Sequence, residues 1–391
     1  MTHRSIVPER RAGWVFWRRP SAALRSGSMR STVSFGAVAA ALCACSSGHD
    51  DLAVDGTTTT TTTTTTRHTG SGGDGNGGFG ASQGGGGAGG SGGAEPPGPT
   101  ELTFVNGIVD AEAIRICALG YPNGENGDAP PWPASPTGLA YAAGRSIGDP
   151  SSVVPTGVDV RLWVVGGDLS AAAGKTCAEI VSEGQGGSGG GGGGPGFVVA
   201  PLPVLPAAVW DSGKSLLLVA AGCIGGPGHS DQADKLVCGS AYGPTTPTAT
   251  LVAVGMSRKT DPSHVSLQAV HASVAATDFD LKVTPGFDNS LEKPLSWGLS
   301  FGALDPKPPY DVLSADDYGP AAKVAFKTYA PNDTVPTSAT LLGDLFGAGE
   351  VAASDFTDGR GFTLVAVGPY PGLGAGSFWK PFTLVLVRAE P

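Results

Sequence analysis

The stretch Val265–Thr284 reads VSLQAVHASVAATDFDLKVT and contains two short apolar runs, which are separated by small and polar residues. In the second run, Phe279, Leu281 and Val283 alternate with charged residues. Successive side chains of a β-strand point to opposite faces, so this alternation is typical of a strand that buries one face. The stretch therefore predicts two consecutive strands joined by a short turn.

Ten further runs of this kind follow one another from Glu101 onward, with Gly, Pro and Asp between them. They are Leu102–Asn106, Ala113–Leu119, Val158–Val165, Phe197–Val204, Ser215–Ala221, Thr248–Val254, Leu299–Gly302, Lys323–Tyr329, Phe362–Val367 and Phe382–Val387. Helical periodicity is weak and limited to Asp168–Glu183 and Ser338–Ala353. Many short strands with frequent turns predict an all-β fold of Ig-like antiparallel β-sandwiches.

The folded part of the chain aligns with itself as two tandem units. Leu102 aligns with Leu267 and Ile114 with Phe279 without a gap. Three later matches in the same order pair Gly138–Tyr141 with Gly298–Phe301, Leu216–Gly222 with Phe362–Gly368, and Thr250–Val254 with Thr383–Val387. We therefore predict two β-sandwich units, at 101–258 and 263–391, with a disordered Gly-rich insertion at 184–196 in the first.

Two segments of the second unit resemble a bacterial family known only as the domain of unknown function 4397. Val270-His271-Ala272-Ser273, followed by Asp280-Leu281, is similar to the opening of that family, and Phe362–Gly368 is similar to a later motif. The first unit departs from the pattern, because Asn106 stands at the His position and Arg115 at the Asp position. The resemblance implies tandem extracytoplasmic β-sandwich domains and implies no catalytic residue.

Residues 1–44 have the composition of an export signal. They carry seven Arg and one Glu and end in the apolar run Val33–Ala44, which is too short to span a bilayer permanently. A start at Met29 gives a compact signal of the usual form, and the sequence leaves both starts, Met1 and Met29, open. We predict that residues 1–44 are a signal peptide.

Leu42-Cys43-Ala44-Cys45 resembles the bacterial lipoprotein box. The resemblance implies cleavage before Cys45 and acylation of that residue, and several acyl chains together give stable anchoring. Because Ser46 rather than Asp follows, anchoring in a Gram-negative cell is expected at the outer membrane, on its periplasmic or cell-surface face. The alternative is an ordinary secretory signal with incidental cysteines.

Residues 45–100 predict a disordered tether. They include the run Thr57–Thr66 and a Gly/Ser-rich tract at Gly70–Gly93, which offer few apolar side chains to offset the entropy of ordering the backbone. A flexible chain of this length reaches roughly 40 Å. Beyond residue 44 the chain has 17 basic and 33 acidic residues, so its surface repels phosphate backbones and nucleic acid is excluded as a partner.

Four cysteines remain after the lipoprotein box, and all lie in the first unit: Cys117, Cys177, Cys223 and Cys238. An even number in an exported chain predicts two disulfides, with three possible connectivities. A bridge between the two cysteines of the insertion, Cys223 and Cys238, would stabilise the fold by roughly 3 kcal/mol. We prefer this pairing, which leaves Cys117 with Cys177. The cysteines lack C-x₂-C spacing, so zinc is the weaker alternative, and we predict no metal or cofactor.

The sequence contains no complete catalytic set. Gly298–Gly302 matches the G-x-S-x-G pattern, but no His follows His271 to complete the triad order of such hydrolases. We predict a non-enzymatic lipoprotein that serves as a binding, adhesion or structural module for a glycan or an envelope protein. The binding candidates are Trp379, expected at an exposed hairpin tip, and the acidic loop pair Asp316 and Asp317. The alternative is an envelope enzyme that acts on carbohydrate through those loop carboxylates.

Overall fold

The computed structural model describes residues 100–186, 196–210, 213, 215–226, 231–243, 245–285, 291–306, 324–371 and 379–389. The chain divides into two units, Met1–Gly72 and Gly73–Pro391, and all described residues belong to the second. The predicted signal peptide, Cys45 and residues 45–99 of the predicted tether therefore lie outside the described residues.

The described residues form mostly β-strands, which confirms the all-β prediction. The strands of the N-terminal group are β1 Glu101–Ile108, β2 Ala113–Tyr121, β3 Leu139–Ala140, β4 Gly144–Ile147, β5 Asp159–Gly167, β6 Phe197–Leu205, β7 Ser215–Gly222 and β8 Thr250–Met256. Those of the C-terminal group are β9 Ser266–His271, β10 Phe279–Pro285, β11 Lys293–Leu299, β12 Leu304–Asp305, β13 Val324–Tyr329, β14 Pro336–Leu341, β15 Gly361–Val367 and β16 Thr383–Arg388.

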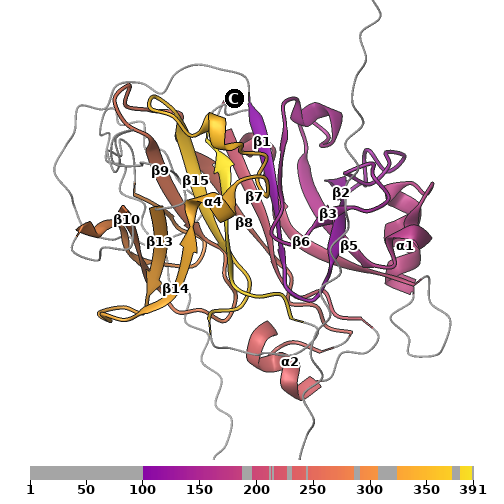
Figure 1. Ribbon diagram of the computed structural model, residues 1–391. Helices are drawn as coiled ribbons and strands as arrows, with labels where there is room; N and C mark the ends of the chain where they lie inside the picture. The colour runs from indigo at the N-terminus through magenta and orange to yellow at the C-terminus, as the bar shows by residue number, and fades with distance from the viewer. Residues whose placement is uncertain are drawn as a thin grey trace, which may run out of the picture. The chain divides into compact units, whose positions relative to one another are not determined.

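The strands make four sheets, two from each group (Figure 1). We call β4-β1-β7-β8 and β12-β9-β15-β16 the inner sheets, and β3-β2-β5-β6 and β11-β10-β13-β14 the outer sheets. The two groups have the same strand order, with each strand of the first replaced by the strand eight places later.

The registers of the two groups agree as well. Paired positions in one group correspond to paired positions in the other at residues that the sequence alignment matches. The pair Leu102–Leu216 corresponds to Leu267–Phe362, the pair Ala221–Thr250 corresponds to Val367–Thr383, and the pair Ile114–Leu139 corresponds to Phe279–Leu299. We call two positions corresponding when they share this place in the strand order and register.

The outer sheets are antiparallel as predicted, whereas the two inner sheets are mixed, which corrects the prediction of wholly antiparallel sandwiches. β1 pairs with β7 in parallel, and β9 pairs with β15 in parallel. A glycine with positive φ is the last residue of β7, Gly222 at 93°, and another comes directly after β15, Gly368 at 88°. A Cβ at either position would approach a backbone oxygen to within 2.6 Å, so both turns require glycine.

A central core lies between the two inner sheets. In β7, Leu216 and Leu218 point into the core of the N-terminal group, whereas Leu217 and Val219 point into the central core. The C-terminal group contributes Val270, Ala272, Val365, Val367, Val385, Val387 and Ala389 to the central core. Every residue of β7, β9 and β15 is buried, and β7 and β15 are almost continuous apolar runs because both of their faces are covered.

The α-helices in the described part of the chain are few and short. They are α1 Cys177–Gly186, α2 Asp231–Cys238 and α4 Leu342–Leu345. The predicted disordered insertion at 184–196 begins inside α1, so its first three residues are helical, and residues 187–195 lie outside the described residues. Among the described residues, none of these helices has the length and apolar character needed to cross a membrane.

We expect Val365→Asp to unfold both groups together, because Val365 is fully buried in the central core. An unpaired carboxylate there should cost at least about 3 kcal/mol of unfolding free energy. Hydrogen exchange at increasing denaturant, read in peptides from β2 and from β10, measures this. Val335→Asp, at an exposed position, is the control and should change little. Loss of protection in β10 while β2 stays protected would contradict the shared core.

Candidate functional site

The outward face of the β11-β10-β13-β14 sheet gathers charged and aromatic side chains. In β10, Phe279 and Leu281 point into the core of the C-terminal group, so Lys282 points outward. Lys282 lies opposite Lys327 of β13, and Tyr329 lies two residues further along β13.

Two lysines directly opposite each other on neighbouring strands repel. Glu292 relieves the repulsion, since its Oε2 lies 3.1 Å from Nζ of Lys282 and its Oε1 lies 3.5 Å from Nζ of Lys327. The hydroxyl of Tyr329 donates to the same Oε1. The exposed fractions of the Lys282, Glu292 and Lys327 side chains are 17%, 14% and 8%, so the cluster is largely shielded from solvent.

The protonation states of the cluster follow from these contacts. Burial acts to raise the pKa of Glu292, but the hydrogen bonds from Tyr329 and Lys282 and the charges of both lysines outweigh it and lower the pKa below its usual value. Burial and the Glu292 carboxylate raise the pKa of Tyr329. At neutral pH Glu292 is therefore ionised, and Tyr329 keeps the proton that it donates.

Trp297 of β11 stands beside this cluster and is 63% exposed. Nζ of Lys282 lies 5.4 Å from the centroid of the Trp297 ring and 4.1 Å from that of Tyr329, within the range of cation–π attraction. Asp280 accepts a 2.7 Å hydrogen bond from the backbone N–H of Gly298, which fixes the end of β11. The indole is thus exposed but held in place.

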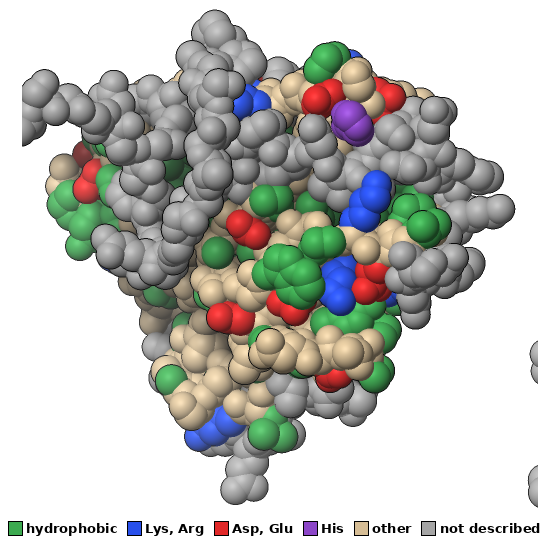
Figure 2. Space-filling model, turned by 90° about the vertical axis from the view of Figure 1, so that its left-hand side faces the viewer, with side chains coloured by type: hydrophobic (Ala, Val, Ile, Leu, Met, Phe, Trp, Pro, Cys, Tyr) green, Lys and Arg blue, Asp and Glu red, His purple; other side chains and the backbone are tan. Residues whose placement is uncertain are grey.

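We call Trp297, Lys282, Glu292, Lys327 and Tyr329 the Trp297 surface. Figure 2 views the molecule from the side of β10 and β13, and shows hydrophobic side chains directly next to basic and acidic ones. An exposed aromatic ring with hydrogen-bond donors and acceptors at its rim is suited to ligand binding rather than to core packing.

The corresponding sheet face of the N-terminal group is covered by α1. Cys117 and Trp163 are paired at the positions that correspond to Lys282 and Lys327. They pack with Cys177, Ile180 and Val181 of α1 in an apolar cluster. The same sheet face is therefore an internal contact in one group and a charged surface in the other.

The two groups differ in the connection that follows β5 in the N-terminal group and β13 in the C-terminal group. Between β5 and β6 the chain inserts a 3₁₀ turn at Leu169–Ala172 and then α1, which covers the face. Between β13 and β14 it makes only a short hairpin connection, Ala330–Val335. The hairpin supplies no counterpart of α1, so this connection does not cover the Trp297 surface.

The two disulfides join the predicted partners. Cys117 pairs with Cys177 and Cys223 with Cys238, with Cα atoms 5.3 Å and 5.6 Å apart. The first attaches α1 to the outer sheet, and the second closes the loop that carries α2. Disulfides persist in oxidising compartments, so the folded part resides outside the reducing cytosol.

Of the predicted binding residues, Trp379 lies within the described residues. Trp379 is half-buried against Cys238 and Tyr242, not at an exposed tip, because the disulfide-closed loop packs over it. Asp316 and Asp317 lie outside the described residues. The sequence analysis favours Trp379 over Trp297, and the Lys282–Glu292–Lys327 cluster is missed because it depends on strand register.

His271 and Asn106 occupy corresponding positions, and the side chain of each accepts a hydrogen bond from the backbone N–H two residues later. The backbone N–H of Ser273 donates to Nδ1 of His271 at 3.1 Å, and that of Ile108 donates to Oδ1 of Asn106 at 3.0 Å. The other ring nitrogen of His271 lies 3.2 Å from the carbonyl oxygen of Thr277. A neutral ring with its proton on Nε2 satisfies both contacts, so His271 is a turn-forming residue.

Two other possibilities raised by the sequence, a nucleophilic serine and a metal site, find no support in the described residues. Gly298–Gly302 spans the end of β11 and a turn, and Ser300 Oγ bonds only weakly to the carbonyl of Gly298, at 3.4 Å. The described residues contain no cluster of three His, Cys, Asp or Glu side chains able to hold a metal ion.

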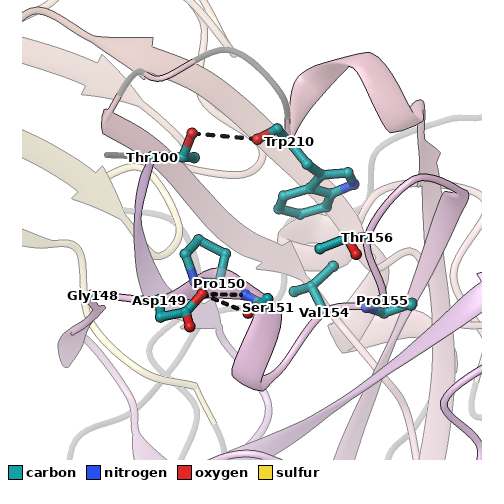
Figure 3. A pocket seen from close by; sticks show the side chains of 9 residues that line it. All are labelled: Thr100, Gly148, Asp149, Pro150, Ser151, Val154, Pro155, Thr156 and Trp210. Carbon is teal, nitrogen blue, oxygen red and sulfur yellow. Dashed lines mark hydrogen bonds between the residues drawn. The ribbon is translucent and has the colours of Figure 1, made fainter. Parts of the chain in front are cut away.

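A pocket of about 280 Å³ lies in the N-terminal group, near the start of β1 (Figure 3). Its lining includes Thr100, Asp149, Pro150, Val154 and Trp210. The Asp149 carboxylate accepts from Ser151 through both the backbone N–H and the hydroxyl, and Trp210 is 7% exposed. The pocket therefore offers a ligand much less aromatic surface than Trp297 does.

No protein-family model and no curated protein matches this chain. The resemblance to the domain of unknown function 4397 therefore stays a prediction.

We expect His271→Asn to flatten the pH dependence of stability. Burial lowers the pKa of His271, although the Thr277 carbonyl and the Asp278 charge oppose this. The unfolded chain binds a proton near pH 6.5 and the folded chain only at lower pH, so wild-type stability falls as the pH drops below about 6.5. Urea unfolding between pH 7.5 and 5 measures the slope. His264→Asn, at a partly exposed site, is the control, and an unchanged slope in His271→Asn would refute the assignment.

Proposed function

We propose that the protein is a lipid-anchored, non-enzymatic binding module of the cell envelope, and that the Trp297 surface contacts its ligand. The observation that carries this proposal is the 63% exposed indole of Trp297, held beside the Lys282 ammonium. Exposing a large aromatic side chain has a cost in solvation, and a fixed aromatic ring is a common anchor in binding sites.

The location follows from separate observations. Two disulfides indicate an oxidising compartment, and the lipoprotein box at Leu42–Cys45 supplies the anchor. The tether between Cys45 and Thr100 would hold the folded part at a distance of roughly 40 Å from a membrane. Outer-membrane anchoring is part of the proposal.

We expect Cys45→Ser to move the protein from the membrane fraction to the soluble fraction, because the acyl chains supply the membrane affinity. Fractionation and immunoblotting of producing cells measure the change. Cys43→Ser is the matched control and should stay membrane-bound, since it lies before the proposed cleavage site. Membrane retention of Cys45→Ser would show that the lipoprotein assignment is wrong.

We expect Trp297→Ala to weaken binding to isolated envelope fragments by about tenfold, with a change of no more than about 0.5 kcal/mol in stability. Cosedimentation of the Cys45→Ser chain with and without this substitution measures binding. The same preparation is tested on a glycosidase panel. Turnover that Asp316→Ala abolishes would contradict the binding-module proposal and favour the envelope enzyme.

A further inference from the structure

We propose that the Trp297 surface binds an uncharged hexopyranose unit of a glycan. Trp297 is the stacking platform, and Lys282 and Glu292 hydrogen-bond the sugar hydroxyls. This inference rests on the proposed function and names the class of ligand for the same surface.

The apolar part of the recognition is one flat ring. The Lys282 ammonium faces the Trp297 indole at 5.4 Å, and the 63% exposure leaves a large part of the ring open to a ligand. A pyranose chair with equatorial hydroxyls presents C–H groups on its face and hydroxyls at its rim. Its weakly positive C–H groups suit the negative face of an indole.

The polar part offers a donor and an acceptor side by side. Oε1 of Glu292 accepts from Tyr329 and faces Lys327, whereas Oε2 faces Lys282. A carboxylate oxygen has two lone pairs and an ammonium has three N–H groups, so Oε2 and Lys282 both keep hydrogen-bonding capacity for a ligand. Neighbouring hydroxyls of one sugar can donate to the first and accept from the second.

The charges favour a neutral ligand. An anionic group would meet Glu292, and a cationic group would meet Lys282 and Lys327. Glu292 already offsets the charges of the two lysines in part. The chain beyond residue 44, with 33 acidic and 17 basic residues, also repels anionic polymers. Hydroxyl groups satisfy both members of the cluster without this penalty.

The N-terminal group provides an internal comparison. In the sequence alignment Thr137 stands opposite Trp297, since these residues come directly before the matched segments Gly138–Tyr141 and Gly298–Phe301. The charged pair is replaced there by Cys117 and Trp163 under α1. The N-terminal group therefore has no equivalent platform at this position, and Thr137→Ala is a matched control.

The test is affinity electrophoresis of the full chain carrying Cys45→Ser, in gels that contain a neutral hexose polysaccharide (β-1,4-glucan, α-1,4-glucan or β-1,4-mannan) or polygalacturonate. At least one neutral polymer should retard the protein, and the retardation should be insensitive to salt. Trp297→Ala should weaken it roughly tenfold, whereas Trp297→Phe, which keeps an aromatic ring, and Thr137→Ala should retain most of it.

Three results would overturn the inference. They are retardation that Trp297→Ala leaves unchanged, salt-sensitive retardation by polygalacturonate alone, and no retardation by any polymer. If envelope fragments still bind in a Trp297-dependent way in the last case, the proposed function stands and only the saccharide assignment fails.

Discussion

The packing of the two inner sheets against each other is the interaction on which the rest of the structure depends. It buries both faces of β7, β9 and β15, and β7 and β15 carry apolar residues at nearly every position. It also brings the backbones close, since a Cβ on Gly107 of β1 would lie 3.0 Å from Val367 of β15. With the inner sheets engaged in this way, the Trp297 surface lies on an outer sheet, the one formed by β11, β10, β13 and β14.

The two outer sheets have the same strand order and register, and differ in what the chain places over them. The N-terminal group covers its face with α1, attached by the Cys117–Cys177 disulfide. The C-terminal group has Lys282 and Lys327 at the corresponding positions, and Glu292 makes that pair tolerable. A lysine pair cannot serve as an apolar contact for a helix, so the substitution converts a packing face into a polar surface.

Local patterns in the sequence predict much of this fold. Alternation in Phe279–Thr284 predicts β10, and the position of Cys223 and Cys238 in one loop favours the observed disulfides. Alternation does not show strand partners, so the parallel β1–β7 and β9–β15 pairs are missed. The predicted strand Leu299–Gly302 is mostly a turn after β11. Local patterns do not predict the candidate site, because strand register brings Lys282 beside Lys327. Side-chain burial, which local patterns do not show either, distinguishes the exposed Trp297 from the half-buried Trp379.

The central claim is that the outer face of the C-terminal group contacts the ligand and the corresponding face of the N-terminal group does not. Hydrogen exchange of the Cys45→Ser chain, with and without envelope fragments, tests it directly. The account predicts added protection in peptides from β10, β11 and β13, and none in peptides from β2 and β5. Added protection confined to β2 and β5, or to the pocket beside Trp210, would contradict it.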